Sequence, residues 1–406
     1  MRIIIIANFT NCFDGERVGR FSYLMEALSD RGHIVELITS DFFHGTKSRR
    51  PEPMQALYKS KITLCHEPGY KKNISLLRLY SHWRWGHNVL KYLRTVEKPD
   101  IVYCAVPSLT ATRLAAKYCE KNNIKFVTDV QDLWPEAFYM VVHKKVIQKL
   151  FWPLLHSANY IYSHSDLAVA VSETYVQRTL SVNSKRINGV SVYLGNDGEL
   201  FNSERGAFRV ERTTDDEILL CYVGGLKDSY DIQCVIDALA EVNNSRRIKN
   251  TIRFVLIGDG PLRARFEQYA KNKHVDCLFV GRKSYTEMAS LLCSCDICIN
   301  PIVKGSAASI INKVGDYALS GLPVINTQES REYRELLNKY GCGINCECGN
   351  SSEVAEAIIN LAACEEKRQE MGRKSLLLAQ ERFDRRNTYM KIINELEKLA
   401  KCINIS

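Results

Sequence analysis

The chain has 406 residues, which is long for one hydrophobic core and enough for two domains of about 150–200 residues each. Hydrophobic residues make up 46% and charged residues 25%, an ordinary soluble composition that argues against a disordered chain. No apolar run approaches the roughly 18 residues of a membrane-spanning helix, so an integral membrane protein is not expected.

The formal net charge of +9 is unevenly distributed. Lys and Arg outnumber Asp and Glu by 26 to 18 in residues 1–200, but only by 29 to 28 in residues 201–406. A basic N-terminal half attracts nucleic acid, anionic lipid or a phosphorylated acceptor, and charge alone does not choose among them. Since no nucleic-acid-binding module is recognisable, we expect no nucleic acid partner.

Fifteen cysteines are many, but several lie in apolar stretches, such as Cys104 and Cys221. We therefore expect reduced thiols in a cytoplasmic protein rather than a disulfide framework. Cys293, Cys295 and Cys298 are spaced closely enough to suggest a metal site. A predicted helix ends at Cys293 and a predicted strand contains Cys298, so their convergence on one ion is not expected.

In the first half, short β-branched runs alternate with amphipathic helices. Residues 2–7 are predicted as a buried strand rather than a signal peptide, because the apolar run is short and turns polar at Asn8. Further strands are predicted at 34–39, 100–106, 124–128, 166–171 and 190–194. A helix is predicted from Phe21 to Arg31, ended by Gly32, while residues 41–98 show no regular pattern.

The polar residues 202–217 interrupt the pattern and are predicted as a linker. Strands then follow at 217–223, 251–257, 275–280, 296–300, 322–326 and 343–346. A charged amphipathic helix from about 384 to 401 ends the pattern. The rhythm predicts an α/β chain with two doubly wound, Rossmann-like domains, 1–200 and 201–383, with the helix at 384–406 packing back on the first.

Ligands of open parallel sheets bind at the carboxyl ends of the strands. Strand 217–223 runs into Gly224 and Gly225, with Lys227 close behind, and strand 251–257 runs into Gly258. Glycine lets backbone N–H groups approach a phosphate, but strand-to-helix turns also need glycine for geometry alone. Each glycine signal by itself is therefore weak.

A helix predicted to begin near Ile311 carries Lys313 in its first turn, where the helix dipole disfavours a cation. A lysine kept at this position indicates an anion nearby. Asp316 follows one turn later on the same face. The alternative interpretation is an ordinary surface ion pair between the two side chains.

Five segments together resemble the retaining glycosyltransferases of family 4, which have the GT-B fold with two Rossmann-like domains facing across a cleft. These are YLGND at 193–197, YVGGL at 222–226, LIGDGP at 256–261, DICINP at 296–301 and KVGDYALSGLP at 313–323. Residues 31–35, 128–136 and 171–173 fit as well, and the string DLWPE at 132–136 is similar to a subgroup that builds bacterial surface polysaccharides. The resemblance covers nearly all of residues 215–350.

The resemblance implies a nucleotide-sugar donor in the second domain. The implied donor-binding residues are Gly224, Gly225, Lys227, Gly258, Arg282, Ser309, Asn312, Lys313 and Asp316. Asp316 takes the place of a family glutamate near the ribose, and Lys313 matches a Ser/Asn-Lys variant of the motif. The family's other glutamate falls on Ala308, and its usual Arg and Lys fall on Gly225 and Tyr230.

The implied reaction retains the anomeric configuration, and the departing phosphate helps to deprotonate the acceptor. Fixed cations and helix N–H groups stabilise the charge that builds on that phosphate, which makes Lys313 a catalytic candidate. Asp132, on the facing strand end, is the second. We expect no metal and no other cofactor, since no Asp-x-Asp pair follows a plausible strand.

The acceptor is expected in the first domain. The candidate acceptor-binding residues are Arg17, Gly19, Arg20, Gln131 and Glu136, with Gln131 at the place of a family histidine. For Arg17 and Arg20 the alternative is solvation or packing with nearby acids. For Asp132 and Glu136 it is capping of the Trp134–Pro135 turn.

Cations lie beside large apolar residues at 144–155 and again at 71–94, a pattern typical of a surface that rests on an anionic membrane. The alternative is a helix packed on its own sheet. The sequence thus predicts a glycosyltransferase that uses a lipid-linked or oligosaccharide acceptor in bacterial capsule, O-antigen or exopolysaccharide synthesis. It would work in the cytoplasm, peripherally on the inner face of the membrane. A sugar-nucleotide 2-epimerase and a non-catalytic partner subunit remain open.

Overall fold

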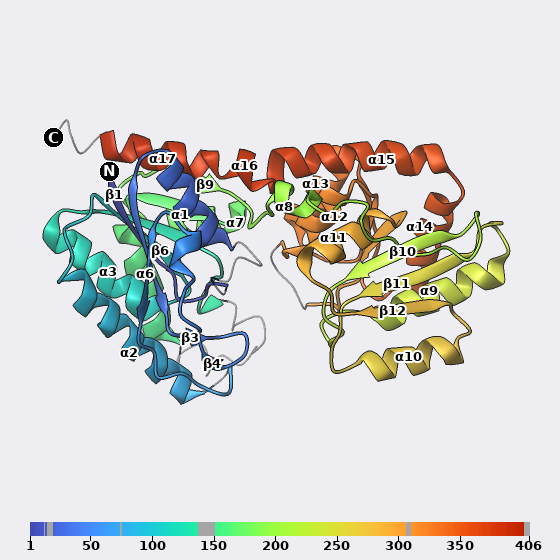
Figure 1. Ribbon diagram of the computed structural model, residues 1–406, viewed down its shortest axis with the longest axis horizontal. Coiled ribbons are helices and arrows are strands. Elements are labelled where there is room, and N and C mark those ends of the chain that lie inside the picture. Colours follow the sequence, from blue (N-terminus) through green and yellow to red (C-terminus); the bar gives the residue numbers. More distant parts are fainter. Residues whose placement is uncertain (12, 14–18, 74, 137–150, 306–309, 402–406) are drawn as a thin grey trace. The chain divides into compact units, whose positions relative to one another are not determined.

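The computed structural model describes residues 1–406 except 12, 14–18, 74, 137–150, 306–309 and 402–406. The chain divides into two compact units, each built around a parallel β-sheet (Figure 1). Unit 1 comprises Met1–Tyr193 and Tyr389–Ser406, and unit 2 comprises Leu194–Thr388.

The sheet of unit 1 has seven strands in the order β5-β2-β1-β6-β7-β8-β9, and every pairing is parallel. The strands are β1 (Arg2–Ile6), β2 (Ile34–Ser40), β5 (Lys61–Cys65), β6 (Ile101–Val106), β7 (Lys125–Val130), β8 (Leu167–Ala170) and β9 (Gly189–Ser191). A small antiparallel hairpin, β3 (Phe42–Phe43) and β4 (Ser48–Arg49), follows β2. The six strands predicted for this half are confirmed, and β5 is an addition.

The described helices of unit 1 are α1 (Arg20–Asp30), the 3-10 turn η1 (Gln55–Leu57), α2 (Leu76–Leu93), α3 (Leu109–Asn122), α6 (Trp152–His164), α7 (Glu173–Leu180) and α17 (Met390–Lys401). On one face of the sheet, Ile3 and Ile5 of β1 pack with Leu24 of α1 and with Ile392 and Leu396 of α17. Central parallel strands are covered on both faces, which explains the uninterrupted isoleucine run of β1. Each such buried side chain contributes about 1.5–3 kcal/mol.

The sheet of unit 2 has six parallel strands in the order β12-β11-β10-β13-β14-β15. They are β10 (Ile218–Val223), β11 (Ile252–Ile257), β12 (Cys277–Gly281), β13 (Ile297–Asn300), β14 (Val324–Asn326) and β15 (Gly343–Asn345). All six strands predicted for this half are confirmed. Leu220 and Tyr222 of β10 share a hydrophobic core with helices α9 and α14.

The described helices of unit 2 are α8 (Gly198–Asn202), α9 (Ile232–Ser245), α10 (Arg263–Asn272), α11 (Tyr285–Cys293), α12 (Lys313–Ser320), α13 (Arg331–Tyr340), α14 (Ser351–Ala362), α15 (Glu365–Leu378), the π-helical turn η2 (Ala379–Phe383) and α16 (Arg385–Thr388). In both sheets the strand order reverses beside the first strand, between β1 and β6 and between β10 and β13. Such reversal points open a crevice at the carboxyl ends of the strands, where ligands bind.

The boundary between the units differs from the expected one at 200/201. It falls after Tyr193, because the Asn196 N–H donates to Phe383 O and the Arg385 N–H donates to Asn196 O, which ties this segment to unit 2. The predicted linker at 202–217 also belongs to unit 2. The Phe208 N–H donates to Ser290 Oγ of α11, and the Val210 N–H to Ser294 Oγ just after it.

Candidate functional site

Two glycines form the carboxyl edge of the unit 2 sheet, directly after β10 and β11. Gly224 and Gly258 both have φ of +144°, a conformation that residues with a side chain rarely adopt. A Cβ on Gly258 would lie 1.9 Å from Gly224 O, and one on Gly224 would lie 2.6 Å from Lys313 Nζ. Close approach of backbone and side chain at this edge therefore requires both glycines.

Lys313 begins α12, and its ammonium group reaches this glycine edge. Nζ is buried and has no hydrogen-bond partner among the described residues. It lies 4.1 Å from the centroid of the Tyr222 ring and 3.8 Å from that of the Tyr230 ring. Burial lowers the pKa of Lys313 well below its ordinary value, and the charge of Asp316 only partly offsets this. The geometry is that of a cation held by aromatic faces with its hydrogen-bond donors unused.

Asp316 is also buried, but its carboxylate turns to other partners. Its Oδ1 accepts hydrogen bonds from Asn196 Nδ2 and from Tyr285 Oη, the latter at 2.9 Å. Lys313 is 9% exposed and Asp316 5%, so the alternative of a surface ion pair between them is wrong. A ribose-binding role for Asp316 stays a prediction.

The remaining donor-site candidates surround Lys313 less closely. Lys227 and Arg282 are exposed side chains that follow β10 and β12, and exposed Asn312 directly precedes α12. Gly225 accepts a hydrogen bond from Tyr222 Oη at 2.9 Å, which fixes one of the two rings around the lysine. Ser309 lies outside the described residues.

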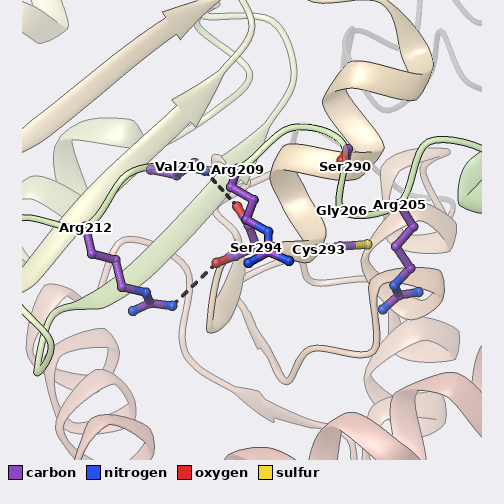
Figure 2. Close-up of a pocket in the computed structure, with 8 residues that line it drawn as sticks. All are labelled: Arg205, Gly206, Arg209, Val210, Arg212, Ser290, Cys293 and Ser294. Carbon is purple, nitrogen blue, oxygen red and sulfur yellow. Dashed lines mark hydrogen bonds between the residues drawn. The ribbon is translucent and has the colours of Figure 1, made fainter.

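A cavity of about 610 Å³ lies elsewhere in unit 2 (Figure 2). It is lined by Arg205, Gly206, Arg209, Val210, Arg212, Ser290, Cys293 and Ser294. Arg212 pairs with Asp296 at 2.9 Å, immediately before β13, so this cavity lies at the amino ends of the strands. It is thus separate from the edge that carries Lys313.

Unit 1 has a pocket of about 470 Å³ at the carboxyl ends of β1, β6 and β7. It is lined by Phe9, Thr10, Asn11, Phe43, His44, Gly45, Arg50, Arg78, Pro107, Gln131, Asp132 and Trp134. The structure therefore brings two predicted residues, Gln131 and Asp132, to one cavity beside the reversal point of the sheet. A smaller cavity of about 140 Å³ is also lined by Gln131.

Asp132 is the titratable acid of this pocket wall. Its Oδ2 accepts a hydrogen bond from Trp134 Nε1 at 3.3 Å, within the turn that follows β7. Burial raises the pKa of Asp132, while its hydrogen bonds to Trp134 and to the Leu133 backbone act in the opposite direction. Both the catalytic and the turn-capping interpretation of Asp132 agree with this geometry.

Arg20 is a correction to the acceptor-site prediction. Its guanidinium forms a two-pronged ion pair with Asp129 at 2.7 and 3.1 Å inside unit 1. Nη1 donates to Val192 O, Tyr193 O and Tyr389 Oη. The side chain is buried and fully engaged, so Arg20 joins α1, β7 and the C-terminal segment instead of facing a ligand.

Glu136 is likewise engaged by protein, since its Oε1 pairs with Arg178 Nε of α7 at 2.7 Å. Gly19 is the residue that precedes α1, and its N–H donates to Ser22 Oγ. Gln131 Nε2 donates to Asp129 Oδ1 at 2.6 Å. Arg17 and the predicted membrane cations Lys144, Lys145 and Lys149 lie outside the described residues.

Comparison with known protein families gives two matches, one in each half of the chain. The family model described as "Glycosyltransferase Family 4" matches residues 20–190, and the model described as "Glycosyl transferases group 1" matches residues 217–364. One match lies in unit 1 and the other in unit 2. The chain belongs to the glycosyltransferases.

Among curated relatives, an uncharacterized glycosyltransferase of Methanocaldococcus jannaschii is 26% identical over 52% of this chain and 54% of its own length. The N-acetyl-alpha-D-glucosaminyl L-malate synthase of Bacillus anthracis is 25% identical over 54% of this chain and 56% of its own. These alignments thus span about half of each relative. A crystal structure of Anabaena HepE in complex with UDP has a TM-score of 0.67 at 17% identity and covers 98% of this chain and 100% of HepE, which establishes the shared GT-B fold.

Sequence reasoning did not assign a site role to the rings that hold the lysine of this glycosyltransferase. Tyr230 stands where the resemblance places a family lysine, and this substitution was the available signal. Its contact with Lys313 joins residues far apart in sequence, which no local pattern reveals. Arg78, noticed only as part of a basic stretch, proves to line the unit 1 pocket.

The cysteine group of the glycosyltransferase is divided between two elements as expected. Cys293 ends α11, and Cys298 lies in β13. In the part of the chain that the structure describes, no three His, Cys, Asp or Glu side chains gather as metal ligands. Nor does any described helix combine the length and apolar character needed to cross a membrane.

Proposed function

We propose that this glycosyltransferase moves a sugar from a nucleoside-diphosphate sugar to a lipid-linked saccharide, with retention of anomeric configuration, in bacterial surface-polysaccharide synthesis. The observation that carries the proposal is the Lys313 ammonium, buried at the glycine edge of unit 2 without a hydrogen-bond partner in the described part of the chain. A diphosphate is the ligand that such a cation and such backbone turns suit.

On the donor side, Gly224 and Gly258 allow the backbone and the Lys313 side chain to approach closely at the end of the sheet, and Lys313 supplies positive charge. In the transition state the bond to the leaving phosphate lengthens and negative charge gathers on its oxygens. A fixed cation in a site with little water stabilises that charge more than it stabilises the bound donor. This chemistry needs no divalent metal, and we propose that none is used.

On the acceptor side, the unit 1 pocket of about 470 Å³ is large enough for a sugar residue and is lined by aromatic and polar side chains. Asp132 lies in its wall and is the candidate for orienting the acceptor hydroxyl. Because the departing phosphate can take the hydroxyl proton, Asp132 positions the acceptor in this proposal and does not act as a nucleophile.

Peripheral attachment to the cytoplasmic face of an anionic membrane is part of the proposal, and α2 supports it. Leu76 is 83% exposed, Leu77 65% and Trp83 46%, and the exposed Lys71 and Lys72 precede the helix. Apolar side chains next to cations on one helix suit the interface of an anionic bilayer.

The membrane test is flotation with vesicles that contain phosphatidylglycerol. Leu76→Ser with Leu77→Ser should reduce the vesicle-bound fraction several-fold, whereas the matched pair Leu376→Ser with Leu377→Ser, exposed leucines of unit 2, should not. Equal flotation of all three proteins would contradict membrane attachment through α2.

The test of the activity is a donor screen. Purified protein is incubated in EDTA with UDP-, GDP- and dTDP-sugars, with and without a bacterial lipid extract, and nucleoside diphosphate release is followed for wild type and Lys313→Ala. Release from one donor that the lipid stimulates and the substitution removes is the expected result. A changed nucleotide sugar without transfer would identify a 2-epimerase. Absence of both release and donor binding would indicate a non-catalytic partner subunit.

A further inference from the structure

The acceptor pocket of unit 1 presents a cation to its interior that ordinary sugar binding does not require. We infer that this pocket recognises an oxyanion on the acceptor, either the carboxylate of an acidic sugar or a phosphate, through the Arg78 guanidinium. The inference rests on the proposed function, because it takes the ligand of this pocket to be the acceptor.

Arg78 lies in the first turns of α2, and its guanidinium is surrounded by aromatic rings. Its Cζ is 4.5 Å from the centroid of the Trp134 ring and 5.9 Å from that of Phe9. Nη1 donates to Asn73 O at 2.8 Å, but buried Nε has no hydrogen-bond partner among the described residues. Leaving a buried donor unpaired is unfavourable, and a bound oxyanion would supply the missing acceptor. The aromatic contacts do not use the Nε donor, so Nε stays available to a planar carboxylate or a phosphate.

The charges around the pocket leave Arg78 with the least compensation. The ionisable groups nearby are the cations Lys47, Arg50 and Arg78 and the acids Glu67 and Asp132. Arg50 already donates to the backbone oxygens of Ser40, Asn11 and Thr10. Buried Glu67 accepts from Asn8 Nδ2, Ser40 Oγ and Ser81 Oγ at 2.6–2.9 Å. Asp132 is thus the acid that lines the cavity itself, and a third negative charge, supplied by a ligand, would balance the three cations.

The pKa values of two histidines near Arg78 reflect the same positive charge. Burial first, and then the charges of Lys47 and Arg78, lower the pKa of His44 to about 4. Burial together with Arg78 lowers the pKa of His82 to about 3. Both rings are therefore neutral at pH 7, and His44, which lines the pocket, adds surface to it without adding charge.

The inference is tested by calorimetric titration of the full chain with glucuronic acid, glucose 1-phosphate and glucose. At least one of the two anions should bind about tenfold more tightly than glucose, which is the size of one charge-assisted pair. Arg78→Gln should remove that advantage and leave glucose binding unchanged. The control Arg84→Gln changes an exposed arginine of the same helix and should behave like wild type. Lys313→Met separates the two phosphate sites, because anion binding at Arg78 should survive it.

The arms also distinguish the sources of the oxyanion. Arg78-dependent binding of glucuronic acid alone assigns an acidic sugar, and Arg78-dependent binding of glucose 1-phosphate alone assigns a phosphate-bearing acceptor. Equal affinity for glucose and both anions, or anion binding that Arg78→Gln leaves intact in a protein with wild-type urea unfolding, overturns the inference. Nucleoside diphosphate release in the donor screen does not depend on this outcome. Release without anion binding removes only the inference, while anion binding without release removes the transferase proposal.

Discussion

The Lys313 ammonium lies 3.8 Å from the centroid of the Tyr230 ring, and Tyr230 is a position at which the chain departs from the family pattern. Tyr230 stands where the resemblance places a lysine, and Gly225 where it places an arginine. Both usual cations are thus absent, while a lysine from α12 reaches the same edge and is held by aromatic faces. We therefore propose that Tyr230 positions Lys313 and does not mark a lost binding group.

Replacing the ring should expose this positioning role. A desolvated cation–π contact is worth about 2 kcal/mol, so Tyr230→Leu should raise the donor KM about 10- to 30-fold. Tyr230→Phe keeps the ring and should stay within about twofold of wild type. Steady-state kinetics with the donor found in the screen makes the comparison. If Phe and Leu impair the enzyme equally, the hydroxyl and not the ring is what Lys313 needs.

Removing the lysine should stabilise unit 2 while it abolishes transfer. The pKa of Lys313 is lowered in the folded state, so between that pKa and 10.5 the unfolded chain binds more protons. The unfolding free energy of the wild type should therefore rise with pH in that window, and Lys313→Met should lack this rise. At pH 7 the variant should be more stable by about 1–3 kcal/mol, the cost of burying an unpaired polar group.

Urea titrations of wild type and Lys313→Met from pH 6 to 9 measure both effects, and kcat should fall at least about 100-fold in the variant. Gln268→Met, a substitution at an exposed position of α10, controls for the effect of introducing a methionine. A variant less stable than wild type at every pH would show that the ammonium makes a stabilising contact in the free protein.

Binding of a nucleoside diphosphate should be accompanied by proton uptake. An anion beside Nζ favours the charged lysine and so raises its pKa from the lowered value toward the ordinary one. Above the pKa of the free protein, part of the lysine must therefore gain a proton on binding. Calorimetry with UDP and GDP in buffers of different ionisation enthalpy detects this, and Lys313→Met should remove it. Heats that do not vary with the buffer would place the diphosphate away from Lys313.

The strands were predictable because each carries its signal locally, and the parts that were missed show where local signals end. Predicted strands such as 217–223 and 251–257 differ from β10 and β11 by one residue at their starts. By contrast, the sequence of α2 shows no clear helical pattern. Leu76 and Leu77 on its exposed side and Trp85 on its buried side obscure the 3.6-residue period. Strand β5 is short and begins with an exposed lysine, so it too lacks a clear pattern.

At the candidate site, glycines and Lys313 were predictable because strand ends and helix starts are local features. What holds the lysine was not, since Tyr230 and Lys313 meet only after the three crossovers from β10 to β13 have formed. The acceptor-site prediction for Arg20 failed for the same reason. The acids close to Arg20 in sequence are not its partners. Its partner is Asp129 on β7, which comes near Arg20 only when α1 packs on the sheet of unit 1.

The Arg20–Asp129 pair should therefore govern the stability of unit 1 and not acceptor affinity. Asp129→Ala leaves a buried guanidinium without its counter-ion and should cost about 3–5 kcal/mol. Arg20→Met combined with Asp129→Leu removes both charges and should recover much of that loss. Urea unfolding of Arg20→Met, Asp129→Leu and the double variant gives the coupling energy. In whatever fraction stays folded, the acceptor KM should be that of wild type. A specific rise in acceptor KM in Arg20→Met alone, with unfolding like that of the double variant, would return Arg20 to the acceptor site. A rise only in variants that lack Asp129 would instead point to Gln131, which donates to Asp129 and lines the pocket.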